Sequence, residues 1–515
     1  MSLATPIGPD TTSRSAFGQA LAAAASVVLT IAATHRGPGL SPDSTFYLSS
    51  GLNLARSGRL VDFTGAPLTV FPPGLPAIVA VGNRLGLGAD ATARIVGVVS
   101  IAAVVVLAHA LLRRHIASPV VVWIATAWVA ISPFLLDIAR MAWTETPFIA
   151  VILGMLLLLE GLTERDSILP TLFGVVLLCW TAFLLRYAGL ATIPAAALAV
   201  LWTRRQRLVQ AVGITAAVTA ASIAVPAFWM LRNRARDGSS LGPRQRSSLA
   251  IGDVAGQLKR TLVRWLLPFG PAALRTSLAL LLVVTFLALV GLAIKRGMTN
   301  GPLAPTELTT IAPIAIFGVV YGIYLVIAEL RTTLDPIDSR LLSPVYVPGI
   351  VLVAIGVQMI LALRPSTLRS FARIVSMVFA AYVLGHAVIS IAHTRLAYRD
   401  GVGYASRAVQ SSGLAQAVRG LSEVSMVATN SEGALYELWA VARKEPLRQL
   451  PSTDLAPLAA EVRCARAPAY LAWFGARADR PSSTDAVTLA AVYDRGDGAL
   501  YRMSVPASAG SCSTR

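Results

Sequence analysis

The chain has 515 residues, of which 55% are hydrophobic and only 14% are charged. Its mean hydropathy of +0.66 excludes an ordinary soluble enzyme or soluble binding module. The formal net charge of +18 would point to nucleic acid in a soluble chain, but aromatic and basic residues are not interleaved as base stacking requires. We therefore expect no nucleic-acid partner, and we interpret the excess charge as basic loops that face anionic lipid headgroups.

Apolar segments long enough to cross a bilayer, which takes about 20 helical residues, recur along the chain. They predict an all-α polytopic membrane domain with about eleven transmembrane helices, near residues 17–35, 92–112, 118–136, 145–161, 167–184, 187–202, 208–230, 274–294, 308–330, 341–363 and 371–393. A cytoplasmic N-terminus would place every short basic loop on the cytoplasmic side, as the positive-inside rule requires. The remaining loops and the tail after about residue 394 are then expected outside.

The first outside loop, residues 36–91, is long enough to hold structure of its own. Leu48, Leu52 and Ala55 form an apolar stripe at helical spacing, which predicts a helix lying in the membrane interface, and a second such helix is expected to start at Pro73. Asp43 stands at the head of the first helix. Local pattern favours a helix N-cap for this residue, and general-base chemistry is the alternative.

The tail reads as a separate α/β domain, so the chain is predicted to divide into a membrane domain, residues 1–393, and a small extracytoplasmic domain, residues 394–515. SMVATN, AYLAWF and VTLAAVYDRGDGALYRMSV predict strands, and GALYELWAVARK predicts a helix. Cys464 and Cys512 both lie in this tail, where a disulfide would be allowed, although no spacing rule fixes that pair.

Charged residues at or just beyond helix ends share the outside face with Asp43 in this topology: Arg140, Glu145, Arg186, Arg232, Glu329 and Arg340. Arginines there can simply snorkel to the interface, and Arg140 has the further option of an ion pair with Glu145. Alternatively, arginines bind a phosphate while a carboxylate removes a hydroxyl proton. Together these residues suggest transfer of a group from a lipid phosphate.

Several short motifs then follow in a familiar order. Asp43, FPPGLP, ARMAWTETPF, LLRYAGL, WMLRNRARDGSSLGPR and DSRLLSPVYVP resemble, over roughly residues 17–365, the bacterial relatives of dolichyl-phosphate-mannose protein mannosyltransferases. These are membrane glycosyltransferases of the GT-C class, family 39-like. The sequence departs from the family pattern in two respects: Ser44 stands where many members have a second acid, and Val70 and Phe71 stand where some have a lysine before the paired prolines.

The resemblance implies an inverting glycosyltransferase of the bacterial plasma membrane, with a polyprenyl-phosphate sugar as donor and a glycan, lipid or protein hydroxyl as acceptor. Asp43 matches the catalytic base, and Glu145 matches a second acid that orients the acceptor or holds a divalent cation such as Mg²⁺ or Mn²⁺. Arg186 and Arg340, with Arg140 and Arg232, are the candidate ligands of the donor phosphate. A transporter or flippase of lipid-linked sugars and a non-catalytic scaffold are the alternative functions.

Overall fold

The computed structural model describes residues 9–163, 168–268, 270–300, 305–362, 368–422, 425–439, 448–449 and 453–506. The chain divides into two compact units. The first, called here the helical unit, comprises Met1–Ala32, Thr69–Leu75 and Ile95–Arg395. The second, called the mixed unit, comprises Ala33–Leu68, Pro76–Arg94 and Leu396–Arg515, so it joins most of the first outside loop to the tail.

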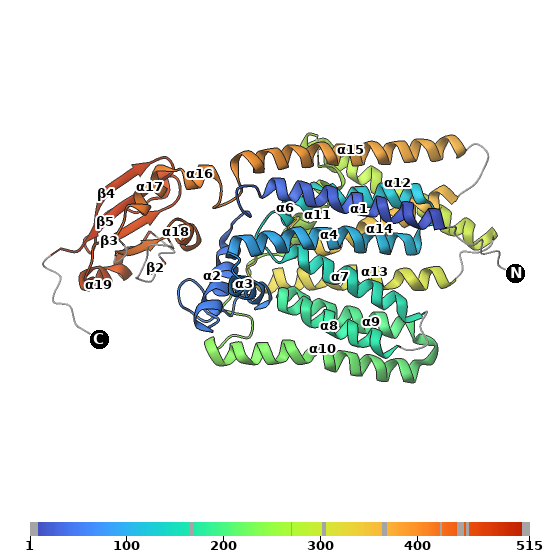
Figure 1. Ribbon diagram of the computed structural model, residues 1–515, viewed down its shortest axis with the longest axis horizontal. Helices are drawn as coiled ribbons and strands as arrows, with labels where there is room; N and C mark the ends of the chain where they lie inside the picture. The colour runs from blue at the N-terminus through green and yellow to red at the C-terminus, as the bar shows by residue number, and fades with distance from the viewer. Residues whose placement is uncertain are drawn as a thin grey trace. The chain divides into compact units, whose positions relative to one another are not determined.

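Long helices running roughly side by side build the helical unit (Figure 1). In chain order they are α1 (Pro9–Ala33), α4 (Ala89–His115), α5 (Pro119–Ala130), α6 (Pro133–Ala139), α7 (Glu145–Glu160), α8 (Leu169–Leu185), α9 (Thr192–Thr203), α10 (Leu208–Asp237), α11 (Ile251–Leu266), α12 (Ala272–Asn300), α13 (Pro305–Arg331), α14 (Ser343–Ala362) and α15 (Leu368–Asp400). Helix α7 packs against α8, and α9 packs against α10 and α13. Fully buried side chains such as Phe148, Phe183 and Phe317 fill the space between them.

Large apolar side chains also cover the outside of this unit. Val209 is 91% exposed, Phe228 is 72% exposed and Leu280 is 65% exposed, which water would disfavour but lipid tails accommodate. Four helices among the described residues are long and apolar enough to cross a membrane, or five if the bent pair α5 and α6 is one span. The chain is therefore an integral membrane protein.

The predicted count of about eleven spans is larger than this and stays a prediction. Part of the difference arises where the helices are short. The predicted spans at 145–161, 167–184 and 187–202 fall on helices of 16, 17 and 12 residues. Pro133 opens α6 where the chain bends by 42°, because proline cannot continue the preceding helix.

The mixed unit contains a five-stranded sheet of order β2-β1-β3-β5-β4. Its strands are β1 (Met426–Thr429), β2 (Arg448–Gln449), β3 (Ala469–Trp473), β4 (Thr488–Arg495) and β5 (Gly498–Ser504), and its helices are α2 (Pro42–Ser57), α16 (Arg407–Gln410), α17 (Gly413–Arg419), α18 (Glu432–Trp439) and α19 (Ala456–Cys464). Helix α3 (Gly74–Arg84) begins in the helical unit and continues here. β1 pairs with β3 in parallel and β3 pairs with β5 antiparallel, so the tail holds the small mixed sheet that its sequence predicts. The predicted domain boundary between residues 393 and 394 stays a prediction.

Helix α2 is buried on more than the predicted apolar stripe. Leu48 is buried as expected, but Ser49 and Ser50, which helical spacing places on the opposite polar face, are also almost completely buried. Within the mixed unit, α2 packs against α18. Its predicted place in the membrane interface stays a prediction.

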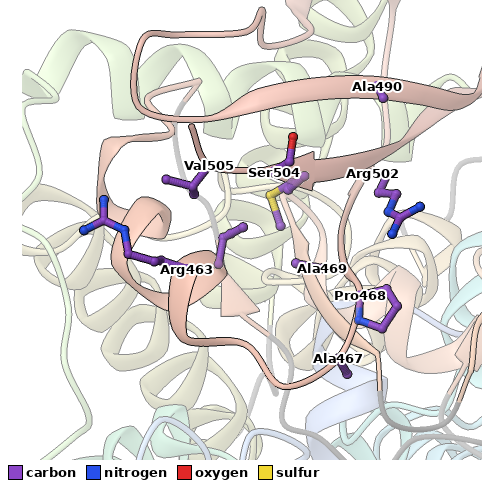
Figure 2. A pocket seen from close by; sticks show the side chains of 10 residues that line it. Arg463, Ala467, Pro468, Ala469, Ala490, Arg502, Ser504 and Val505 are labelled. Atoms are coloured by element: carbon purple, nitrogen blue, oxygen red, sulfur yellow. The ribbon is translucent and has the colours of Figure 1, made fainter. Parts of the chain in front are cut away.

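A cavity of about 520 Å³ opens beside the sheet, between the end of α19 and the strands β4 and β5 (Figure 2). Arg463, Ala469, Arg502 and Met503 are among its lining residues. None of the residues singled out by the sequence lines it. Cys464 beside it is disulfide-bonded, and its predicted partner Cys512 lies outside the described residues.

Candidate functional site

The helical unit contains a buried carboxylate held by two arginines. Glu145 is the first residue of α7, and its side chain is completely buried. Its Oε1 atom accepts a hydrogen bond from Nε of Arg340 and forms an ion pair with Nη1 of Arg186. Each arginine side chain is only 13% exposed. The structure therefore brings together three of the six residues that the sequence nominated.

The two arginines of this cluster, Arg186 and Arg340, both lie where the chain turns near the end of a helix. Arg186 ends α8 in an extended conformation, because the chain there leaves the helix and enters the short 3-10 turn Tyr187–Ala191. Its Nη1 also donates to the hydroxyl of Thr144, the residue just before α7, at 3.4 Å. Arg340 lies in the loop between α13 and α14, and its guanidinium stacks over Trp143 at 4.2 Å from the ring centroid.

The Arg340 loop is fixed by its own turn and by α11. Oδ1 of Asp338 accepts hydrogen bonds from the backbone N–H groups of Arg340 and Leu341, at 2.8 and 3.1 Å. From α11, the Thr261 hydroxyl donates to the carbonyl of Ile337 at 2.9 Å. Gln257 and Trp265 of the same helix also bond this loop, at Ile337 N–H and at the Ser339 hydroxyl. Arg340 is thus presented on a rigid support.

The cluster contains two guanidinium groups around one fully buried carboxylate. Asp335 approaches Arg340 at 3.4 Å, but its side chain is 73% exposed, so solvent screens it. The second oxygen of Glu145, Oε2, is buried and accepts no hydrogen bond within the described part of the chain. A buried cationic pair of this kind suits an anion such as a phosphate.

A second hydrogen-bonded group holds the segment Thr69–Leu75, which contains the paired prolines. The Tyr187 hydroxyl donates to the carbonyl of Thr69 at 2.5 Å. That hydroxyl accepts hydrogen bonds from Asn233 Nδ2 at 2.9 Å and from the indole of Trp229 at 3.2 Å. Asn233 is fully buried on α10. Turn chemistry is the plain sequence interpretation of this asparagine, so its role had no sequence signal.

The loop after α10 closes over the same segment. Gly242 has φ +80°, and a Cβ atom there would lie 2.6 Å from the Cα of Val70, so only glycine fits. Nη2 of Arg244 donates to the carbonyl of Val70 at 3.3 Å. Arg186 and Arg244 both interact electrostatically with Tyr324 of α13.

Two nominated arginines have other partners. Arg140 forms an ion pair with Asp137 at 2.9 Å and donates to the carbonyl of His393 at 3.3 Å. The option of an Arg140–Glu145 pair is wrong, because Asp137 lies one helical turn before Arg140 and captures it. Arg232 donates to Oδ1 of Asn233 at 2.9 Å and stacks over Trp229 at 4.6 Å.

Asp43 belongs to the mixed unit, where it occupies the first turn of α2. The N-cap is Ser41, whose hydroxyl accepts a hydrogen bond from the N–H of Ser44 at 3.4 Å, so the capping interpretation of Asp43 is wrong. Pro42 occupies the first helical position after the cap, and Asp43 is therefore the second residue of the helix. Its half-buried carboxylate interacts electrostatically with Tyr404.

No protein-family model matches the sequence. No curated protein matches it either. Solved structures share its fold. ArnT from Cupriavidus metallidurans in the apo state has a TM-score of 0.60 at 12% identity, covering 94% of this chain and 97% of that one. The same protein bound to undecaprenyl phosphate gives 0.56 at 14% identity over the same shares.

The arabinofuranosyltransferase AftD from mycobacteria has a TM-score of 0.52 at 16% identity, covering 94% of this chain and 39% of that one. At such identities the similarity concerns the fold alone. The chain therefore has a GT-C-like membrane fold with a small C-terminal mixed sheet.

Proposed function

We propose that the chain is a membrane glycosyltransferase that moves a sugar from a polyprenyl-phosphate donor to an acceptor hydroxyl on the extracytoplasmic face, with inversion. The observation that carries this proposal is the Arg186–Glu145–Arg340 cluster, in which two guanidinium groups, each only 13% exposed, lie against one carboxylate in a GT-C-like fold. The solved structure of ArnT with undecaprenyl phosphate supports a lipid phosphate as the ligand. The motif order of the sequence supports the finer relation to the protein mannosyltransferases.

The donor end of the reaction needs cations. When the glycosidic bond to the phosphate breaks, the leaving phosphate gains a negative charge. Arg186 and Arg340 stabilise that charge, since guanidinium groups bind phosphate oxygens in pairs and are already oriented by Thr144 and Trp143. Arg140 and Arg232, engaged with Asp137 and Asn233, are weaker candidates for this role.

The acceptor end needs a base. In the proposed step, Asp43 takes the proton of the acceptor hydroxyl while that oxygen bonds to the anomeric carbon and the bond from that carbon to the phosphate oxygen breaks. One bond forms, one breaks, and the proton ends on Asp43. The attack comes from the face opposite the phosphate, which inverts the anomeric centre.

Glu145 acts on the arginines in this proposal. Its carboxylate faces two guanidinium groups, so a divalent cation there would meet two positive charges. Among the described residues no group of three His, Cys, Asp or Glu side chains could hold a metal ion. The residues around Glu145 do not fit a metal ion, and the proposed transfer step uses none. Glu145 is thus a positioning residue that fixes the separation and angle of Arg186 and Arg340.

Turnover of a panel of polyprenyl-phosphate sugars tests the proposal in the purified protein. We expect Asp43→Asn to lower kcat by at least a hundredfold while binding of the lipid phosphate is kept. Arg186→Ala and Arg340→Ala should weaken that binding. Asp479→Asn, an exposed acid of the same unit as Asp43, and Arg260→Ala, an exposed arginine of α11, are the matched controls and should behave as wild type.

Each alternative has a distinct outcome. A wild type that binds the lipid phosphate, transfers no sugar and moves the lipid between leaflets of a vesicle is a transporter or flippase. The scaffold alternative predicts that the wild type neither transfers sugar nor moves the lipid. In cells, deletion of the residues after 400 would then abolish function, whereas Asp43→Asn would not. Equal turnover by wild type and Asp43→Asn would remove Asp43 from the mechanism.

A further inference from the structure

The helix that carries Asp43 packs against the C-terminal part of the mixed unit, Leu396–Arg515, called here the C-terminal domain. Two stretches far apart in sequence pair just before α2: Leu40 and Gly403 form a parallel bridge. The N–H of Leu40 donates to the carbonyl of Val402 at 3.3 Å, and the N–H of Tyr404 donates to the carbonyl of Leu40 at 2.9 Å. Gly403 has φ +60°, and a Cβ atom there would lie 1.9 Å from the Leu40 oxygen. The chain is therefore tied down one residue before the Ser41 cap.

Helix α18 then contacts the first turn of α2 itself. The Thr45 hydroxyl donates to Oε1 of Glu437 at 3.1 Å. At Gly433, near the start of α18, a Cβ atom would lie 3.4 Å from the Cα of Pro42 and 3.4 Å from Oγ1 of Thr45. The two helices approach closely because this position has no side chain. Pro42 and Thr45 flank Asp43, so α18 contacts the residues on both sides of it.

Aromatic packing fixes the rest of α2. Phe63 is only 5% exposed, and it packs against Phe46 of α2 at 5.1 Å and against Tyr436 of α18 at 5.2 Å between ring centroids. The same Phe63 belongs to the core that includes Leu435 of α18 and Ala472 of β3. A helix of 16 residues is marginal by itself in water, so this packing determines where α2 lies.

We propose that the C-terminal domain is the positioning platform for Asp43, with Gly433 and Glu437 of α18 and Gly403 as the positioning residues. The inference rests on the proposed function, in which Asp43 is the base. In this role the C-terminal domain contributes to catalysis by holding α2 in place, and it does not have to bind the acceptor itself. Misplacement of a base by about 1 Å is enough to cost roughly a hundredfold in rate.

Charge around the contact supports this role. Burial, with a smaller contribution from Asp90, raises the pKa of Glu437 to about 7, while the hydrogen bond from Thr45 opposes the rise. Asp43 and Glu437 both interact electrostatically with Tyr404. The state of Glu437 near neutral pH therefore affects the surroundings of Asp43.

The experiment compares two glycine substitutions in the full-length purified protein. Gly433→Leu inserts a side chain between α18 and α2, whereas Gly496→Leu, in the β4–β5 turn of the same domain, adds the same side chain where a Cβ atom meets nothing within 4 Å. Hydrogen exchange of residues 42–57 reports the placement of α2, and steady-state kinetics reports kcat and the donor KM. Gly433→Ala, whose Cβ would make only close contacts of 3.2–3.4 Å, tests recovery by the smaller side chain.

We expect Gly433→Leu to increase exchange in residues 42–57 and to lower kcat at least tenfold with the donor KM unchanged, because the phosphate-binding arginines are untouched. Gly496→Leu should match wild type, and Gly433→Ala should recover most of kcat. If hydrogen exchange of residues 42–57 in Gly433→Leu equals that of wild type, the C-terminal domain does not position α2, and this holds whether or not any variant transfers sugar. Increased exchange with full kcat overturns the link to catalysis. A wild type without transfer refutes the proposed function and leaves the exchange result to decide the platform by itself.

Discussion

Replacing Glu145 by Gln should change the stability of the folded protein and its affinity for phosphate in opposite directions. The wild-type carboxylate is completely buried and neutralises one of the two arginines that contact it. Glutamine keeps the shape but leaves two guanidinium groups, each 13% exposed, facing a neutral amide. Removing one partner of a buried ion pair costs about 3–5 kcal/mol. We therefore expect the thermal unfolding midpoint of the helical unit to fall by roughly 5–10 °C.

The same substitution should strengthen phosphate binding. In wild type the carboxylate competes with a bound phosphate for Arg186 and Arg340, and glutamine does not. We expect polyprenyl phosphate to bind about tenfold more tightly to Glu145→Gln, which corresponds to about 1.4 kcal/mol. By linkage, saturating lipid phosphate should then raise the midpoint of the variant by more than it raises that of wild type.

Glu160→Gln is the matched control for this test. Glu160 is a second buried carboxylate of the helical unit, and it pairs with His115 at 2.9 Å and with Arg114 at 3.6 Å. Its loss should also lower the midpoint, but the rise on adding lipid phosphate should equal that of wild type. The reasoning is refuted if Glu145→Gln melts with wild type, or if lipid phosphate stabilises both variants equally.

Three further predictions concern the supports of the site. Tyr187→Phe removes the hydroxyl that donates to the Thr69 carbonyl at 2.5 Å and leaves that carbonyl only the longer bond from Asn233 Nδ2 at 3.4 Å, so we expect a loss of about 1–3 kcal/mol in denaturant unfolding with normal expression. Gly242→Val combines a strained φ with a clash at Val70, and faster limited proteolysis of the 69–75 segment should reveal it, whereas Gly213→Val, in open space, should not. Because the folded state raises the Glu437 pKa from 4.5 to about 7, the stability this group contributes is full below about pH 4.5 and is lost as pH rises through about 7. Glu437→Gln should remove that pH dependence, worth up to about 3 kcal/mol in urea unfolding measured from pH 4 to 8, and an unchanged pH profile would contradict the assignment.

Local pattern was sufficient for much of this protein. Composition and apolar run length identified an integral membrane protein, because transfer of helices into lipid depends on the summed hydropathy of consecutive residues. Strand-forming and turn residues predicted β1, β3, β4 and β5 in the tail. This was possible because strand and turn preferences act over a few consecutive residues. Topology also placed Glu145, Arg186 and Arg340 on one face before any contact was known.

Only the tertiary structure decided which of those residues meet. Glu145 and Arg340 are 195 positions apart, and their contact depends on how α7, α8 and the loop between α13 and α14 pack. The sequence offered Arg140 as an equal partner, but the helical geometry of α6 gave it to Asp137. The sequence likewise predicted one apolar stripe on α2, whereas the structure also buries Ser49 and Ser50 and packs this helix against α18. Hydropathy is a property of neighbours in sequence, while ion pairing and helix docking depend on neighbours in space, which form only when the whole chain has folded.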